Sequence, residues 1–182
     1  MSLRLPLIEA VIVADMALHV GLIPLEELRT IAASGSRPGV RRFRKVADLA
    51  DAGAESPMET RLRVQLVEDG LPQPQTQAVL KDGAGNEIAR VDLYYPDVRL
   101  AIEYDGEHHL DRDRMTDDHR RQNRLFAANV HLLRYTWADV RDRRTAISGE
   151  VRAERSRLFR ALGRERVVSG PRETTRSRPG RG

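Results

Sequence analysis

The sequence predicts an α/β protein, in which four strands and their flanking helices follow a small helical module. Three observations predict this class: apolar side chains recur at helical spacing in the first fifty residues, three strand-like runs separated by turns occupy 76–104, and a helix stands on each side of those runs before a last apolar strand. The 182 residues suffice for one compact domain with an appendage. We divide the chain into a helical module (1–52), the α/β domain (53–145) and a basic helix with a disordered tail (146–182).

Composition excludes several classes of protein. The chain has no cysteine, so disulfides, thiolate zinc sites and cysteine nucleophiles are excluded. Its longest apolar stretch, 5–23, is interrupted by Glu9, Asp15 and His19 and therefore predicts a helix outside the membrane. The N-terminus lacks a basic segment followed by an uninterrupted apolar run, so we expect a cytoplasmic protein.

Basic residues are concentrated toward the C-terminus. The whole chain carries 31 basic and 27 acidic residues, but 151–182 alone holds ten Arg against three Glu. Such a tail attracts phosphates in a salt-sensitive way, although a solvated end is the commoner explanation. Lysine occurs only at Lys45 and Lys81, so arginine serves as the general basic residue and its number carries little weight.

Three short helices are expected in the N-terminal module. The first covers 5–19, with an apolar face formed by Leu7, Val11, Ala14 and Leu18. The second begins at Pro24, uses Leu25, Leu28 and Ile31 as its apolar stripe, and ends before the Gly- and Pro-containing segment 35–39. The third covers 40–49 with Phe43 and Val46 facing inward.

The α/β domain opens with a capping box. Ser56 is the N-cap, Pro57 the first helical residue and Glu59 the reciprocal partner of a helix that reaches about Asp69. The runs 76–80 and 88–93 predict a β-hairpin around the turn 81–86, and 99–104 predicts a third strand.

The second half of the domain alternates helix and strand again. Thr116 and the two aspartates after it cap a helix that reaches Ala128, and 130–135 predicts a buried fourth strand. A final helix begins at 137–143 and continues in broken form to Leu162, with order doubtful beyond Gly163. Tyr135 and Trp137 are expected in the core.

Acidic side chains converge on two neighbouring strands. Period two places Glu103 and Asp105 on one face of the third strand and leaves the other face to the core. Asp92 stands across from Glu103 with Cβ atoms about 5 Å apart, while Val91 and Leu93 share the opposite side. Carboxylates this close repel each other unless a cation or protons intervene, and oxygen ligands suit Mg²⁺ or Mn²⁺.

Glu59 has two interpretations. It serves the capping box alone, or it caps the helix and also joins Asp92 and Glu103, because its position relative to Leu62 and Leu66 puts it beside the buried stripe.

The order of these residues resembles a known family. Glu59 on a helix, Val91-Asp92-Leu93 on one strand, Ile102-Glu103-Tyr104-Asp105-Gly106 on the next, and the following His108 and His109 are similar to the restriction-endonuclease-like PD-(D/E)xK superfamily. More narrowly, they resemble a bacterial domain of unknown function related to the very-short-patch-repair (Vsr) mismatch endonucleases. The resemblance covers roughly 56–140 and includes Asp118, Arg121, Leu125 and the run 132–135.

The resemblance implies a restriction-endonuclease-like four-stranded mixed sheet and cleavage of phosphodiester bonds in DNA with Mg²⁺ or Mn²⁺. By this resemblance Asp92 and Glu103 hold the metal, and Glu59 assists as a ligand or orders a water. We assign Arg121 and Arg124 to the phosphate backbone of DNA. No contact with a membrane is implied.

One position departs from the family pattern. The lysine expected two residues after Glu103 is replaced by Asp105, and neither Lys45 nor Lys81 lies where it could substitute. The resemblance to Vsr-type proteins makes His108 or His109 the expected replacement, as a proton acceptor or a phosphate contact. Asp105 also fits an ordinary Asp-Gly turn, and the histidines also fit a solvated loop.

Alternatives remain open from the sequence. An ion pair explains Asp118 and Arg121 at least as well as a substrate contact does. The same fold also suits a catalytically inactive DNA-binding or toxin-antitoxin regulatory protein, which the missing lysine favours. A metabolic enzyme that uses carboxylates lacks support, because the chain has no glycine-rich phosphate loop.

Overall fold

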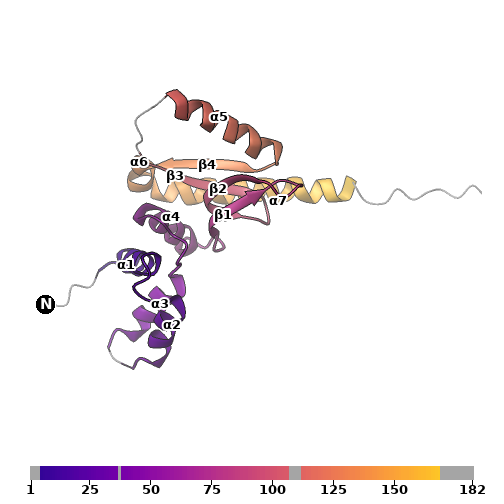
Figure 1. The fold of residues 1–182 in the computed structure, drawn as a ribbon. Helices are drawn as coiled ribbons and strands as arrows, with labels where there is room; N and C mark the ends of the chain where they lie inside the picture. The colour runs from indigo at the N-terminus through magenta and orange to yellow at the C-terminus, as the bar shows by residue number, and fades with distance from the viewer. Residues whose placement is uncertain (1–4, 37, 107–111, 169–182) are drawn as a thin grey trace, which may run out of the picture.

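A computed structural model describes residues 5–36, 38–106 and 112–168, without the side chains of 112–117 and 164–168. The elements in chain order (Figure 1) are α1 (Leu7–His19), α2 (Leu25–Ser34), α3 (Val40–Leu49), α4 (Pro57–Glu68), β1 (Gln75–Lys81), β2 (Glu87–Tyr95), β3 (Leu100–Asp105), α5 (Arg112–Ala127), β4 (His131–Thr136), α6 (Trp137–Asp142) and α7 (Arg144–Val168). The predicted α/β class and the order of helices and strands are confirmed. Among the described helices, none combines the length and apolar character needed to cross a membrane.

The four strands form one mixed sheet in the order β1-β2-β3-β4. The first three strands are antiparallel neighbours, and β4 runs parallel to β3 after the α5 crossover. Leu93 pairs with Ile102 across β2 and β3, while Asp105 pairs with Thr136 across β3 and β4. The parallel pairing places the C-terminal ends of β3 and β4 at the same end of the sheet.

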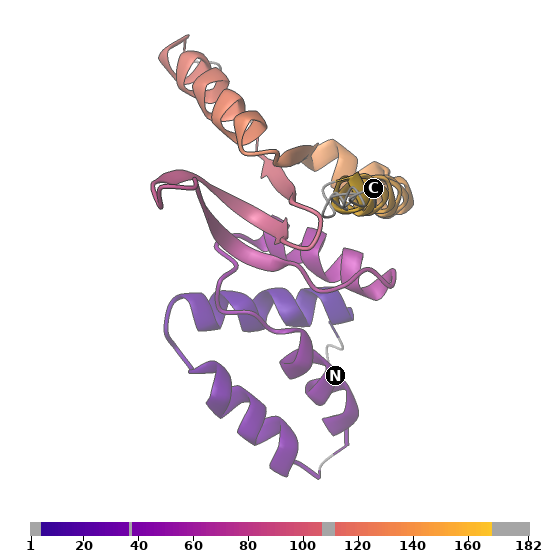
Figure 2. The ribbon, with the colours of Figure 1, turned by 90° about the vertical axis from the view of Figure 1, so that its right-hand side faces the viewer.

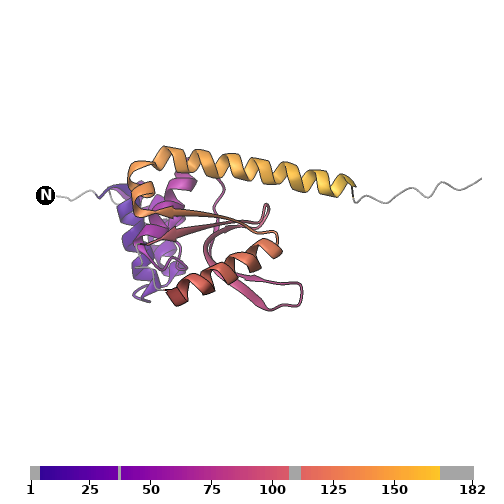
Figure 3. The ribbon, with the colours of Figure 1, turned by 90° about the horizontal axis from the view of Figure 1, so that it is seen from above.

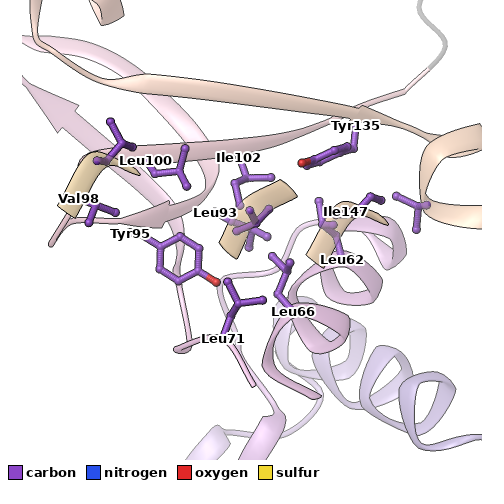
Figure 4. Packing of buried hydrophobic residues seen from close by; sticks show 13 residues of the cluster. Leu62, Leu66, Leu71, Leu93, Tyr95, Val98, Leu100, Ile102, Tyr135 and Ile147 are labelled. Atoms are coloured by element: carbon purple, nitrogen blue, oxygen red, sulfur yellow. The ribbon is translucent and has the colours of Figure 1, made fainter. Parts of the chain in front are cut away.

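Both faces of the sheet are packed. One cluster joins α4 and α7 to the sheet, as Figure 4 shows, and contains Leu62, Leu66, Leu93, Ile102 and Ile147. A second cluster lies beneath α5 and contains Val91, Ala101, Leu125 and Val130. Figure 1 shows α5 and α4 on opposite sides of the sheet, and Figure 3 shows α7 extending along it. From the sequence we assigned only the face opposite Glu103 to the core, but the face carrying Glu103 is packed as well, because α5 covers it.

The strict alternation expected for β2 is broken at Asp92. Val91 packs under α5, whereas Leu93 packs against α4, so these two residues do not share a side as predicted. The break coincides with a distortion of β1: Gln77, between the paired residues Thr76 and Ala78, has a φ of 46°. A left-handed φ is costly for a residue with a side chain, and here it accompanies the change of face beside a cluster of polar groups.

The N-terminal helices pack on one another and on α4, as Figure 2 shows. Their apolar faces form two small clusters, and Val64 of α4 shares one of them with Val11 and Val46. The predicted inward positions of α1 and α3 are confirmed. Ile31 is 46% exposed and does not belong to the stripe of α2, because α3 covers that helix at Leu28 and Ala32 instead.

Three predictions about the second half of the chain were wrong. Helix α5 begins at Arg112, so Thr116 lies within the first turns and is not its N-cap. The final helix is interrupted once, at Arg143, after which α7 runs for 25 residues and passes Gly163. Trp137 is 45% exposed rather than buried, because it opens α6 at the rim of the sheet. Tyr135 is in the core, as predicted.

Candidate functional site

A partly buried carboxyl group lies at the centre of the predicted site. Asp92 extends from β2, and its Oδ2 accepts a hydrogen bond from the backbone N–H of Tyr104 at 2.9 Å. Burial raises the pKa of Asp92 to about 6, assisted by the negative charges of Glu59 and Glu103, although the Tyr104 hydrogen bond acts in the opposite direction. The side chains of Asp92, Glu59 and Glu103 therefore come near enough to influence one another, as the sequence predicted.

Glu59 combines a structural contact with a place beside Asp92. The hydroxyl of Ser56 accepts the Glu59 N–H at 3.2 Å, which confirms the predicted N-cap of α4. The carboxylate accepts the N–H of Glu55 at 3.0 Å, so the reciprocal bond of the capping box goes to the residue before the cap. Glu59 is only 8% exposed. One carboxylate oxygen thus fixes the entry of the chain into α4 and also faces the sheet.

The side chain of Gln77 links the two carboxylates. Its Nε2 donates to Glu59 Oε2 at 2.9 Å and to Asp92 Oδ1 at 3.3 Å. We did not predict this residue. Its position within the hairpin was the available signal, because the register that pairs Thr76 with Leu93 and Ala78 with Val91 brings Gln77 opposite Asp92. The amide directs positive hydrogens between two acids, which is the place where the sequence predicted a cation.

Arginines hold the third carboxylate. Glu103 accepts hydrogen bonds from both terminal nitrogens of Arg121 and pairs with Arg134 Nε at 3.3 Å. Arg134 also makes a two-pronged contact with Asp118, at 2.9 and 2.6 Å, and these hydrogen bonds lower the pKa of Asp118. Positive and negative side chains therefore alternate across β3, β4 and α5. Arg134 was not assigned a role from the sequence, because its partners come from separate elements.

The remaining predicted residues lie at the margin of this group or outside the described chain. Asp105 is exposed at the end of β3. His108 and His109 lie outside the described residues. Arg121 donates to the backbone oxygen of Arg90 at 3.0 Å, and Arg124 Nε donates to Ile88 O at 3.2 Å, so both attach α5 to β2. Their assignment to DNA phosphates stays a prediction.

The ligand type at the cluster fits a hard divalent cation. Asp92 and Glu59 offer carboxylate oxygens, and a bound cation would offset the burial and the repulsion that together raise the pKa of Asp92. Glu103 joins them only when its contacts with Arg121 and Arg134 open. Within the part of the chain that the structure describes, no group of three or more His, Asp or Glu side chains is arranged to hold a metal ion.

Comparisons with known proteins give relatives whose names state no activity. No family model matches the chain, and no solved structure matches it. Two curated relatives, uncharacterized proteins of Mycobacterium tuberculosis from strains CDC 1551 / Oshkosh and ATCC 25618 / H37Rv, are each 35% identical over 112 residues. The match covers 61% of this chain and 41% of each relative, so the chain spans well under half the length of the curated relatives it matches.

Proposed function

We propose that the protein is a metal-dependent nuclease that hydrolyses phosphodiester bonds in DNA. The observation that carries the proposal is the position of the partly buried Asp92 beside Glu59 and Glu103, with a pKa raised to about 6. Partly desolvated acids held close to one another are costly to a fold, and they are found where a cation or a proton transfer uses them. The resemblance of the residue order to PD-(D/E)xK nucleases supports the same class of reaction.

Each of the three acids would have its own role in the hydrolysis. Asp92, oriented by the Tyr104 N–H, would hold the ion together with Glu103 once the contacts of Glu103 with Arg121 and Arg134 open. When bound, the ion supplies positive charge that offsets the charge developing on the phosphate. Glu59 is positioned by the Glu55 N–H and by Gln77, and it would orient the attacking water and accept its proton. The water oxygen then bonds to phosphorus while one P–O ester bond breaks.

A second function is favoured by one specific observation. Arg121 and Arg134 already compensate the charge of Glu103, and Gln77 already bridges Glu59 and Asp92. A cluster of acids whose charges and hydrogen bonds are already compensated by neighbouring side chains needs no metal. Such a cluster is also expected in a protein that binds DNA without cutting it. Both functions require binding of nucleic acid, but only the first includes cleavage.

Cleavage of supercoiled plasmid distinguishes them. We expect nicked or linear product with Mg²⁺ or Mn²⁺, no product with EDTA, and a loss of at least about 100-fold for Asp92→Asn, the scale on which a removed charge-stabilising or acid–base group acts. Glu87→Gln is the matched control, because it makes the same chemical change at an exposed position of the same strand. Equal cleavage by Asp92→Asn and wild type would exclude the site. A gel shift without any cleavage would favour the second function.

A further inference from the structure

A separate cavity lies where α1, α4, α6 and α7 meet. It has a volume of about 350 Å³ and is lined by Met58, Gln65, Trp137, Val140, Arg141 and Arg144, together with Ile8 and Arg61. This volume lies at the lower end of the range for small-molecule sites. The lining combines an aromatic ring, three guanidinium groups and an apolar floor, a composition suited to a planar ligand that carries negative charge.

A buried polar atom in this wall has no partner. Gln65 is 1% exposed and its Nε2 donates to the backbone oxygen of Arg144, yet its Oε1 is buried without a hydrogen bond among the described residues. A buried carbonyl oxygen that accepts no hydrogen bond destabilises the folded state. A ligand that presents an N–H group to Oε1 would remove that destabilisation.

The rim of this cavity carries an arginine stacked on a tryptophan, together with a second arginine. The guanidinium of Arg141 lies 4.0 Å from the centroid of the Trp137 ring, and both side chains are about half exposed. Nucleobases stack favourably on aromatic rings and on guanidinium planes. No described residue pairs with the guanidinium of Arg144, whereas Arg61 and Arg141 are bound to Glu9 and Asp142. Arg144 is therefore free to contact a phosphate.

The cavity and the acidic cluster are built from neighbouring residues of the chain. Met58, in the cavity wall, directly precedes Glu59. Thr136, the residue before Trp137, pairs with Asp105 in the strand that carries Glu103. Both features therefore use residues at the N-terminal end of α4 and at the C-terminal ends of β3 and β4.

We propose that the cavity holds one unstacked nucleobase of a single-stranded or locally opened nucleic acid. The base joins the Trp137–Arg141 stack, donates an amino or imino N–H to Gln65 Oε1, and leaves its phosphate to Arg144. This inference rests on the proposed function, since it names the form of nucleic acid that the protein recognises.

The test uses Trp137, the single tryptophan of the chain, as its own reporter. The full chain is titrated in EDTA with an eight-nucleotide oligodeoxyadenylate, and ribose 5-phosphate serves as a probe with a phosphate but no base. We expect the oligonucleotide to quench Trp137 fluorescence and ribose 5-phosphate to leave it unchanged. We expect Arg144→Ala to weaken binding about tenfold, as loss of a charge-assisted hydrogen bond does. Gln65→Leu, checked for folding by circular dichroism, should weaken it further.

Arg160→Ala is the matched control, because it removes the same charge from an exposed position on the same helix. Equal weakening by Arg144→Ala and Arg160→Ala would overturn the proposal, as would oligonucleotide binding by fluorescence anisotropy that leaves Trp137 emission unchanged. Because EDTA suppresses cleavage, quenching by the oligonucleotide stands even if the plasmid assay finds no nuclease. Conversely, cleavage without quenching would leave the nuclease in place and exclude this cavity.

Discussion

At the scale of single residues, Asp92 shows how a fold sets the chemistry of a carboxyl group. Burial and two neighbouring acids favour its protonated form, while one backbone N–H favours its ionised form, and burial has the larger effect. The net result is a group that titrates near pH 6 instead of near pH 4.

This shift predicts a measurable pH dependence of stability. The pKa of Asp92 is about 6 in the folded state against 3.8 for the ordinary group, so the folded protein binds the proton more tightly. The resulting stabilisation is present below about pH 4 and lost as the pH rises through about 6. Relative to Asp92→Asn, wild type should lose up to about 3 kcal/mol of unfolding free energy between these values.

Urea denaturation of both proteins in EDTA at pH 4 and pH 7 measures this difference. Other titrating groups, including the buried Asp15, are common to the two proteins and cancel in the comparison. If the difference in unfolding free energy between wild type and Asp92→Asn is the same at pH 4 and pH 7, the surroundings of Asp92 do not raise its pKa.

Residues that belong to one short motif could be predicted, and residues brought in by tertiary structure could not. Asp92, Glu103 and Glu59 were found because strand alternation and helix capping act locally. Gln77 and Arg134 were missed because their roles depend on a neighbouring strand and on a helix from elsewhere in the chain.

At the scale of elements, helix boundaries followed the strength of their local signals. Ser56 and Pro57 located the start of α4 within one residue because a cap and a proline act together. The continuity of α7 was missed, although Ile147, Val151 and Leu158 lie at helical spacing and all three are buried. Most residues of α7 are polar, and many of them are arginines. Because only a narrow face of this helix is apolar, its sequence shows a weak helical repeat of apolar residues.

A buried ion pair joins α1 to α4. Asp15 and Arg63 are both fully buried, with Arg63 NH2 2.7 Å from Asp15 Oδ2, and Thr60 Oγ1 donates to the same oxygen at 2.7 Å. Desolvation raises the pKa of Asp15 despite the Arg63 charge. The Asp15 carboxyl therefore depends on Arg63 to remain ionised.

We expect Arg63→Met to lower the free energy of unfolding by about 3–5 kcal/mol, because it leaves the Asp15 carboxyl buried without its cation. Arg29→Ala is the control: it removes an exposed pair with Glu26 and should change stability by less than about 1 kcal/mol. Thermal and urea unfolding of the two variants measure the difference. Equal effects would mean that this contact does not fasten α1 to α4.

At the scale of the whole molecule, the class and the order of the elements along the chain were predictable, but the packing of the layers was not. Local patterns alone predict a helix, three strands, a helix and a strand, whereas the mixed sheet was expected only from the family resemblance. The position of α5 over the carboxylate face depends on contacts such as Leu125 with Val91 and Ala101, which period-two alternation cannot reveal. Because α5 covers that face, Glu103 is partly buried and pairs with Arg121 of this helix.

The central claim is that the partly buried group of Asp92, Glu59 and Glu103 takes a divalent cation, and Mn²⁺ binding measured by electron paramagnetic resonance tests it most directly. Wild type should remove free Mn²⁺ from solution, Glu87→Gln should do so equally well, and Asp92→Asn should bind at least about tenfold more weakly, as expected when a carboxylate ligand is lost. Equal Mn²⁺ binding by wild type and Asp92→Asn, or none by either, would contradict the account.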